Sequence, residues 1–476
     1  MHVRARVRGV MLAVTACVCS LALVLSGASA GGSAASPGVT RATGGGGVPV
    51  LPGFTSFDPA VVGYKQSEVF LSGTASAYAM TAPVSNDGKY SAVATSTAPY
   101  TTRAVVMRPI KRTRFNGTVI VEWLNVSGGS DAGPDWMLGH NELIREGFVW
   151  VGVSAQSLGV NAIKSADPTN ADAVRYANLS HPGDNYSYDI FSQAGQAIRD
   201  NARTILGGLK PKHIIAIGES QSAGRLVTYI DAVHPLAHVY DGFLVHSRMG
   251  GAPIRDDVGV PVLVFQTESD VSFSRGTARQ PDTSMYRLWE VAGTAHYDFY
   301  GLSIQAKDTG DGKSAVAVLA SMQHPTDKPS PNFTCGAPIN TGLAHYVLDA
   351  AFYRLNRWVA KGIVPPVAPR LQTTGAGGVV FATDANGNVL GGIRTPAVDA
   401  PVATLSGRST GGTSFCFLFG STVPFRTAQL KVLYPNHRTF VSAWVRATKK
   451  ALAAGFLVNA DAKELESAAV HSKIGK

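Results

Sequence analysis

The stretch HIIAIGESQSAGR, residues 213–225, contains the pattern that decides the fold. An apolar run typical of a buried strand ends at Gly218, Ser220 follows two residues later, and a helix-forming segment begins at once. This arrangement is typical of a nucleophile elbow, in which a serine on a strained strand-to-helix turn exposes its hydroxyl. Small residues are needed two positions before and after that serine, because the two backbones approach closely there. Gly218 meets the first need, and Ser222 stands where a second glycine is usual.

A second register of the motif has Ser222 as the nucleophile, between Ser220 and Gly224. The apolar run stops at Ile217, so this register would place Ser222 inside the helix instead of on the turn. We therefore predict Ser220 as the nucleophile and keep Ser222 as the alternative.

An acid and a histidine follow this serine along the chain, each after an apolar strand. VPVLVFQTESDV (260–271) ends with Glu268 and Asp270, and EVAGTAHYD (290–298) contains His296. Serine, acid and then histidine is the chain order of α/β hydrolases. The chemistry needs all three, because histidine takes the serine proton and a carboxylate orients and stabilises the imidazole. We predict His296 as the base.

The acid has two candidates. Asp270 is favoured, because the count from Pro261 places it where the acid after the seventh strand normally falls, and Glu268 is the alternative. Two other histidines, His246 in an apolar strand and His345 at a helix start, are expected to pack or to form hydrogen bonds.

Backbone N–H groups are expected to bind the developing oxyanion. One is the N–H of Gln221, directly after the nucleophile, and another comes from the loop after the third strand of this fold. That loop is NVSGG, residues 125–129, so the second donor is Val126 or Ser127. The sequence does not decide between them.

Apolar strands alternate with amphipathic helices over residues 117–300. This alternation predicts an α/β fold with a mostly parallel central sheet flanked by helices, and with the elbow it predicts the α/β-hydrolase fold. SEVFLSG (67–73) and TTRAVVMRP (101–109) predict antiparallel strands before it. We expect one hydrolase domain over residues 54–476, with its core at about 54–300.

The remaining part, residues 301–476, is interpreted as a C-terminal elaboration packed on that core. Residues 301–340 are rich in Gly, Pro and Asp and predict a polar connection. Helices are predicted over 342–362 and 438–455, and a hairpin over 379–393 that turns at Asn386-Gly387.

The first 30 residues (1–30) have the layout of a secretory signal peptide. Three arginines at positions 4–8 precede an apolar run over 10–24 and a small-residue site at 28–30. An uncleaved membrane anchor is an alternative, although the run is short for a spanning helix. A lipoprotein signal ending at Cys17 would cut the run in half. We predict cleavage, a secreted or extracytoplasmic protein without stable membrane insertion, and a flexible linker over 31–53.

Composition agrees with export. Signal cleavage removes two of the four cysteines and leaves Cys335 and Cys416, which we expect to form a disulfide in an oxidising compartment. The net charge of the whole chain is +10, and cleavage after residue 30 removes three arginines and leaves (42 − 3) − 32 = +7. That mild excess is spread along the chain without a dense basic run, so a nucleic-acid partner is not expected. The sequence has no P-loop, no dinucleotide fingerprint and no zinc-ligand spacing, so it implies no cofactor and no metal.

The chain resembles the exported proteins grouped as "α/β hydrolase domain-containing". The resemblance rests on VEWLNVSGG, YSYDIFSQA, GESQSAGR, DGFLVHSR, TESDV and AGTAH, and it extends from about residue 55 to the C-terminal helix, including FCFLFG with Cys416. It implies the fold and a Ser-His-acid triad, and it implies little about the substrate.

A small-molecule ester is the expected substrate, cleaved through an acyl-enzyme by Ser220, His296 and Asp270. An amidase with the same triad is one alternative. A non-catalytic exported binding protein on a hydrolase scaffold is another, although such a scaffold has no need of an intact triad.

Overall fold

A computed structural model describes residues 34–43, 54–81, 85–165, 173–374 and 380–476. The predicted signal peptide, residues 1–30, lies outside the described residues.

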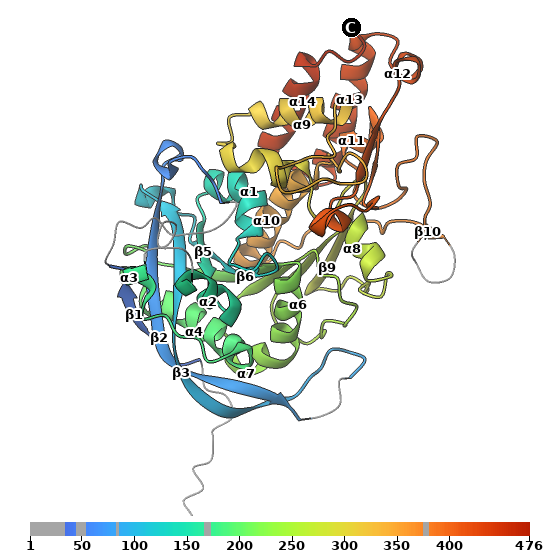
Figure 1. Cartoon of the computed structure of the whole chain (residues 1–476). Coiled ribbons are helices and arrows are strands. Elements are labelled where there is room, and N and C mark those ends of the chain that lie inside the picture. Colours follow the sequence, from blue (N-terminus) through green and yellow to red (C-terminus); the bar gives the residue numbers. More distant parts are fainter. Residues whose placement is uncertain (1–33, 44–53, 82–84, 166–172, 375–379) are drawn as a thin grey trace, which may run out of the picture.

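One large sheet organises the described chain (Figure 1). Its strand order is β1-β2-β3-β5-β4-β6-β7-β8-β9, and the six strands from β5 to β9 in this order pair in parallel. The three strands at the other edge are antiparallel, which confirms the antiparallel pair predicted before the alternating region. The strands are β1 (Gly38–Arg41), β2 (Tyr64–Met80), β3 (Ala92–Pro109), β4 (Thr118–Trp123), β5 (Val149–Val153), β6 (His213–Glu219), β7 (Gly242–His246), β8 (Val262–Thr267) and β9 (Tyr286–Val291).

The parallel strands are buried on both faces, which explains their nearly continuous apolar runs. Successive side chains of a strand point to opposite faces. Ile215 and Ile217 of β6 therefore join one hydrophobic cluster, whereas Ile214 and Ala216 join the other. The predicted mostly parallel, doubly covered sheet is confirmed.

Helices cover both faces of the sheet. The helices α1 (Pro134–Arg145) and α10 (Ala344–Lys361) contribute to the first cluster. The helices α4 (Ser187–Asp200) and α6 (Gln221–Thr228) contribute to the second. The core therefore does not end at residue 300 as predicted, because α10 follows that boundary and covers the sheet.

The predicted polar connection over 301–340 contains a helix, so this prediction is wrong for part of the stretch. Helix α9 (Lys313–Gln323) buries Ala315, Val318, Leu319 and Met322, which lie on one face at helical spacing. The surrounding Gly, Pro and Asp residues hid this short pattern in the sequence.

Two further helices pack at the C-terminal end together with α9, as Figure 1 shows. They are α13 (His437–Ala453), which confirms the predicted helix over 438–455, and α14 (Asn459–His471). The predicted hairpin turn is also present, since Thr383 pairs with Val389 across a turn in which Gly387 has a φ of 81°. The other helices and strands are α2 (Ser157–Ser165), α3 (Ala173–Tyr176), α5 (Ala202–Ile205), α7 (His234–Ala237), α8 (Glu268–Phe273), α11 (Pro396–Asp399), α12 (Thr427–Leu433), β10 (Thr373–Thr374), β11 (Val380–Phe381), β12 (Ala403–Ser406) and β13 (Ser421–Pro424).

Part of the predicted linker is a strand, which corrects the prediction for residues 38–41. Strand β1 pairs antiparallel with β2, from Gly38 opposite Ser72 to Arg41 opposite Val69. Val39 packs against the second hydrophobic cluster. The strand forms because the edge of β2 offers free hydrogen-bonding groups and an apolar contact.

Candidate active site

Ser220 lies on a sharp turn between β6 and α6. Its φ of 58° and ψ of −116° place a non-glycine residue in a strained part of backbone space. The N–H of Ser220 donates to the carbonyl oxygen of His246, 2.9 Å away, so the end of β7 supports the turn. A Cβ at Gly218 would lie 3.0 Å from the backbone of Ser222, which explains the glycine two residues before Ser220.

The alternative nucleophile, Ser222, lies inside α6 and is fully buried. Its hydroxyl has no hydrogen-bond partner within the described part of the chain. Ser220 is partly exposed, so of the two serines only Ser220 presents its hydroxyl at the turn.

The structure brings the three predicted residues together in one chain of hydrogen bonds. Ser220 Oγ lies 2.8 Å from His296 Nε2, and His296 Nδ1 lies 2.6 Å from Asp270 Oδ1. All three follow the carboxyl ends of parallel strands, Ser220 after β6, Asp270 after β8 and His296 after β9. Because these ends meet at one edge of the sheet, residues far apart in sequence meet there.

The surroundings favour a charged Asp270 and a basic His296. Burial opposes the charge of Asp270, but attraction to His296 and hydrogen bonds from His296 and Thr267 outweigh it, so the pKa of Asp270 is lowered. The Thr267 N–H and hydroxyl both donate to Asp270 Oδ2, each at 2.7 Å. Burial alone would lower the pKa of His296. The interactions with Asp270 and Glu219 raise it by more, so the pKa of His296 is raised overall.

Glu268, the alternative acid, points elsewhere. Its carboxylate accepts hydrogen bonds from the N–H groups of Gly293 at 2.5 Å and Gly407 at 2.8 Å. Burial raises its pKa to about 7. Of the two candidate acids, Asp270 is the one bonded to His296, and Glu268 connects the loop before His296 to the C-terminal part.

The two candidate oxyanion donors of the loop after β4 differ in their hydrogen bonds. The Ser127 N–H donates to Asn125 Oδ1 at 2.8 Å, so it is already engaged. The Val126 N–H forms no hydrogen bond within the described residues. Gln221 is the first residue of α6, where N–H groups lack acceptors inside the helix. Its side chain pairs with that of Gln156 through two amide hydrogen bonds of 2.7 and 3.0 Å.

Sequence reasoning missed a second carboxylate at the imidazole. Glu219 Oε1 lies 3.3 Å from His296 Nε2, on the side that also faces Ser220. Asn125 Nδ2 donates to the Glu219 carbonyl oxygen at 3.0 Å and to Oε2 at 3.2 Å. Burial raises the pKa of Glu219 to about 7, against the attraction of His296 and His246. Its position directly before Ser220 was the only signal in the sequence.

The two other histidines have structural partners. His246 Nδ1 lies 2.8 Å from Asp135 Oδ1, and His345 stacks on Tyr300 with ring centroids 3.7 Å apart. Burial lowers the pKa of His345 to about 3. Both line a small cavity of about 10 Å³ that His296 also lines. This space holds about one water and is far smaller than a substrate site.

The described residues contain no group of three or more His, Cys, Asp or Glu side chains arranged to hold a metal ion. Among the helices of the same residues, none combines the length and apolar character needed to cross a membrane.

A serine on a strand-to-helix elbow, with an acid and a histidine after later strands of a mostly parallel sheet, defines the α/β-hydrolase class. The chain belongs to the alpha/beta hydrolase domain family, whose family model matches residues 29–467. No curated protein matches the chain.

Solved structures show distant similarity. A serine hydrolase without lid from Xanthomonas campestris is 14% identical and aligns over 45% of this chain and 83% of its own, with a TM-score of 0.28. Acetyl xylan esterase 1 from Thermoanaerobacterium sp. is 10% identical over 54% of this chain and 81% of its own, with a TM-score of 0.29. An esterase from Pyrococcus furiosus is 10% identical over 50% and 86%, also with a TM-score of 0.29.

Proposed function

We propose that this α/β hydrolase cleaves carboxylic esters of small molecules through an acyl-enzyme on Ser220. The observation that carries the proposal is the pair of hydrogen bonds from Ser220 Oγ to His296 Nε2 at 2.8 Å and from His296 Nδ1 to Asp270 Oδ1 at 2.6 Å. Serine alone is a weak nucleophile, and an adjacent oriented base is what activates it.

In the first half of the reaction, Ser220 Oγ attacks the ester carbonyl carbon and its proton passes to His296 Nε2. The Asp270 carboxylate accepts a hydrogen bond from the Nδ1–H of His296 and stabilises the imidazolium. The carbonyl oxygen becomes an oxyanion, for which the N–H groups of Gln221 and Val126 are the proposed donors. When the intermediate collapses, the bond to the alcohol oxygen breaks and the alcohol takes the proton from His296 Nε2.

In the second half, water attacks the acyl carbon and gives a proton to His296 Nε2. The bond to Ser220 Oγ breaks, the serine recovers its proton from the imidazolium, and the carboxylic acid leaves. Each proton taken up by His296 is therefore returned, and no cofactor enters the cycle.

We also propose that the protein is exported. The disulfide between Cys335 and Cys416 supports this, because such bonds persist in oxidising compartments. N-terminal sequencing of protein from the exported fraction tests it. We expect a mature chain that begins at Gly31, and an intact Met1 in that fraction would contradict cleavage.

A hydrolysis screen tests the activity. Purified protein is assayed with p-nitrophenyl esters of varied acyl length and with arylamides of the same acyl groups, and Ser220→Ala is the control. We expect turnover of the esters that is absent in Ser220→Ala. Faster turnover of the amides would make the protein an amidase, and no turnover of either with no serine labelling would support a binding protein.

A further inference from the structure

Two exposed phenylalanines stand beside the catalytic histidine of the proposed mechanism. Phe273 is 36% exposed and Phe417 is 49% exposed, and no other phenylalanine of the described residues is as exposed. Their ring centroids are 6.1 Å apart, and the Phe273 ring centroid is 6.2 Å from that of His296. Exposed aromatic rings gathered at a polar site are typical of a ligand contact.

Each ring is held by the elements that build the site. Phe273 ends α8, three residues after Asp270. Phe417 follows Cys416 in a short 3-10 turn, Ser414–Leu418. In the same turn, the Leu418 carbonyl oxygen accepts a hydrogen bond from the Tyr297 N–H at 3.3 Å. Phe417 is therefore connected to the residue directly after His296.

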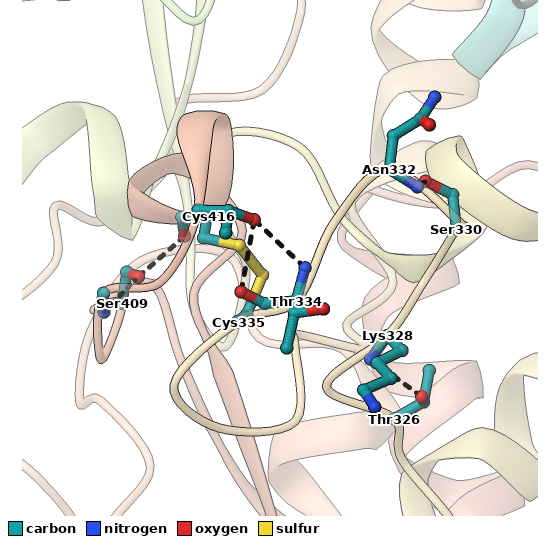
Figure 2. The surroundings of a disulfide bond; sticks show 10 residues. Thr326, Lys328, Ser330, Asn332, Thr334, Cys335, Ser409 and Cys416 are labelled. Carbon is teal, nitrogen blue, oxygen red and sulfur yellow. Dashed lines mark hydrogen bonds between the residues drawn. A yellow bond between two sulfur atoms is a disulfide. The ribbon is translucent and has the colours of Figure 1, made fainter.

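The disulfide also anchors this turn. Figure 2 shows Cys416 bonded to Cys335, whose Cα lies 5.4 Å away although the two residues are 81 positions apart in sequence. The Ser409 hydroxyl donates to the Cys416 carbonyl oxygen at 2.7 Å. An isolated antiparallel β-bridge joins Cys335 to Gly412, four residues before Cys416. The turn that carries Phe417 is thus fixed at several points.

We propose that Phe273 and Phe417 form a subsite that binds an apolar, ring-bearing alcohol portion of the ester, and that the disulfide holds Phe417 in this subsite. The inference rests on the proposed function. His296 Nε2 must give its proton to the leaving oxygen, so the alcohol portion has to lie against the imidazole. The Phe273 ring packs against that imidazole at an interplanar angle of 72°, and Phe417 adds a second, more exposed ring beside Phe273.

Two isomeric esters test the side of the scissile bond on which the ring binds. Benzyl acetate carries its phenyl ring on the alcohol portion, methyl phenylacetate carries the same ring on the acyl portion, and methyl acetate carries none. We expect Phe417→Ala and Phe273→Ala to lower kcat/KM for benzyl acetate about tenfold, mainly through KM, which is the scale of one lost apolar contact. The ratio of kcat/KM for benzyl acetate to that for methyl acetate should fall by a similar factor, whereas the ratio for methyl phenylacetate to methyl acetate should stay within about twofold of the wild-type ratio.

Phe333→Ala is the matched control. Phe333 packs on Phe419 in the apolar layer around the Cys335–Cys416 disulfide, with ring centroids 5.2 Å apart, and among the described residues no ring contact joins it to His296. It should leave the preference for benzyl acetate unchanged. If Phe333→Ala lowers benzyl acetate turnover as much as Phe417→Ala, loosening of the layer explains the effect and the subsite is wrong.

The disulfide is tested by the double variant Cys335→Ser/Cys416→Ser, assayed below its melting temperature. We expect the preference for benzyl acetate over methyl acetate to fall toward that of Phe417→Ala. Equal effects of Phe417→Ala on both isomers, or a larger effect on methyl phenylacetate, would overturn the subsite while leaving the proposed function intact. If the wild-type protein cleaves none of the three esters, the proposed function is overturned, and the subsite with it.

Discussion

The carboxyl group of Glu219 should shift the acid limb of the pH profile, and Glu219→Gln tests this. Glu219 Oε1 lies 3.3 Å from His296 Nε2, and a negative charge there favours the imidazolium. The protonated imidazole cannot take the serine proton. Removing the charge should lower the pKa of His296, so the variant should keep its activity to lower pH than the wild type.

The distance sets the scale of the effect. At an effective dielectric constant of about 20, two unit charges at this separation interact by about 5 kcal/mol. At about 1.36 kcal/mol per pKa unit, a permanently charged Glu219 would raise the pKa of His296 by more than about three units. The pKa of Glu219 is itself about 7, because burial opposes its charge. The two groups therefore compete for protons, and we expect a shift of about one unit.

The assay is kcat/KM for one ester between pH 4.5 and 9, which reports ionisations of the free enzyme. Other titratable groups face Glu219, namely His246, Asp135 and Asp270, and all of them remain in the variant. Glu290→Gln is the control, since it makes the same change in a buried carboxylate that is bonded to Arg279. If the acid limb of Glu219→Gln coincides with that of the wild type, the interaction with His296 is not functional.

Three further predictions concern the acid, the disulfide and stability. Asp270→Asn should lower kcat by about 10⁴-fold through the wrong imidazole tautomer, whereas Glu268→Gln should mainly lower the melting temperature; equal losses of kcat would contradict the assignment. The Cys335–Cys416 disulfide closes a loop over 81 positions, so its removal should lower the free energy of unfolding by about 4 kcal/mol. Two free thiols in exported protein that is denatured without reduction would contradict the bond. Burial raises the pKa values of Glu268 and Asp298 to about 7 in the folded state, whereas both are about 4 in the unfolded chain. Between these values the folded state binds more protons than the unfolded state, so the melting temperature should fall as pH rises from about 5 to about 8. A melting temperature that rises over this range would contradict the raised values.

The parts of the fold with local signals could be predicted from the sequence. The run that becomes β6 is apolar because both faces of that strand are buried, and the small residues around Ser220 reflect the close approach of β6 and α6. The order of Ser220, Asp270 and His296 follows from the order of the parallel strands. Local composition and chain order were sufficient for these features.

Features that depend on distant partners could not be predicted in the same way. Helix α10 has an ordinary amphipathic pattern, and nothing in that pattern says that it covers the central sheet beside α1. The residues of β1 resemble a linker because the pairing partner, β2, provides most of their order.

The site shows the same limit. Glu219 occupies a position at which the motif accepts many residues, and only the fold places its carboxylate at His296. Phe417 lies 121 residues after His296 in sequence, and it reaches the site through Phe273. The proposal of Val126 rather than Ser127 as an oxyanion donor rests on the hydrogen bond from the Ser127 N–H to Asn125 Oδ1, which the sequence does not reveal.

Covalent labelling with a fluorophosphonate, followed by peptide mass spectrometry, directly tests Ser220 as the nucleophile. We expect one adduct on Ser220 and no labelling of Ser220→Ala. Ser222→Ala should be labelled as well as the wild type, because the Ser222 hydroxyl is buried inside α6. An adduct on Ser222, or labelling that persists in Ser220→Ala, would contradict this assignment.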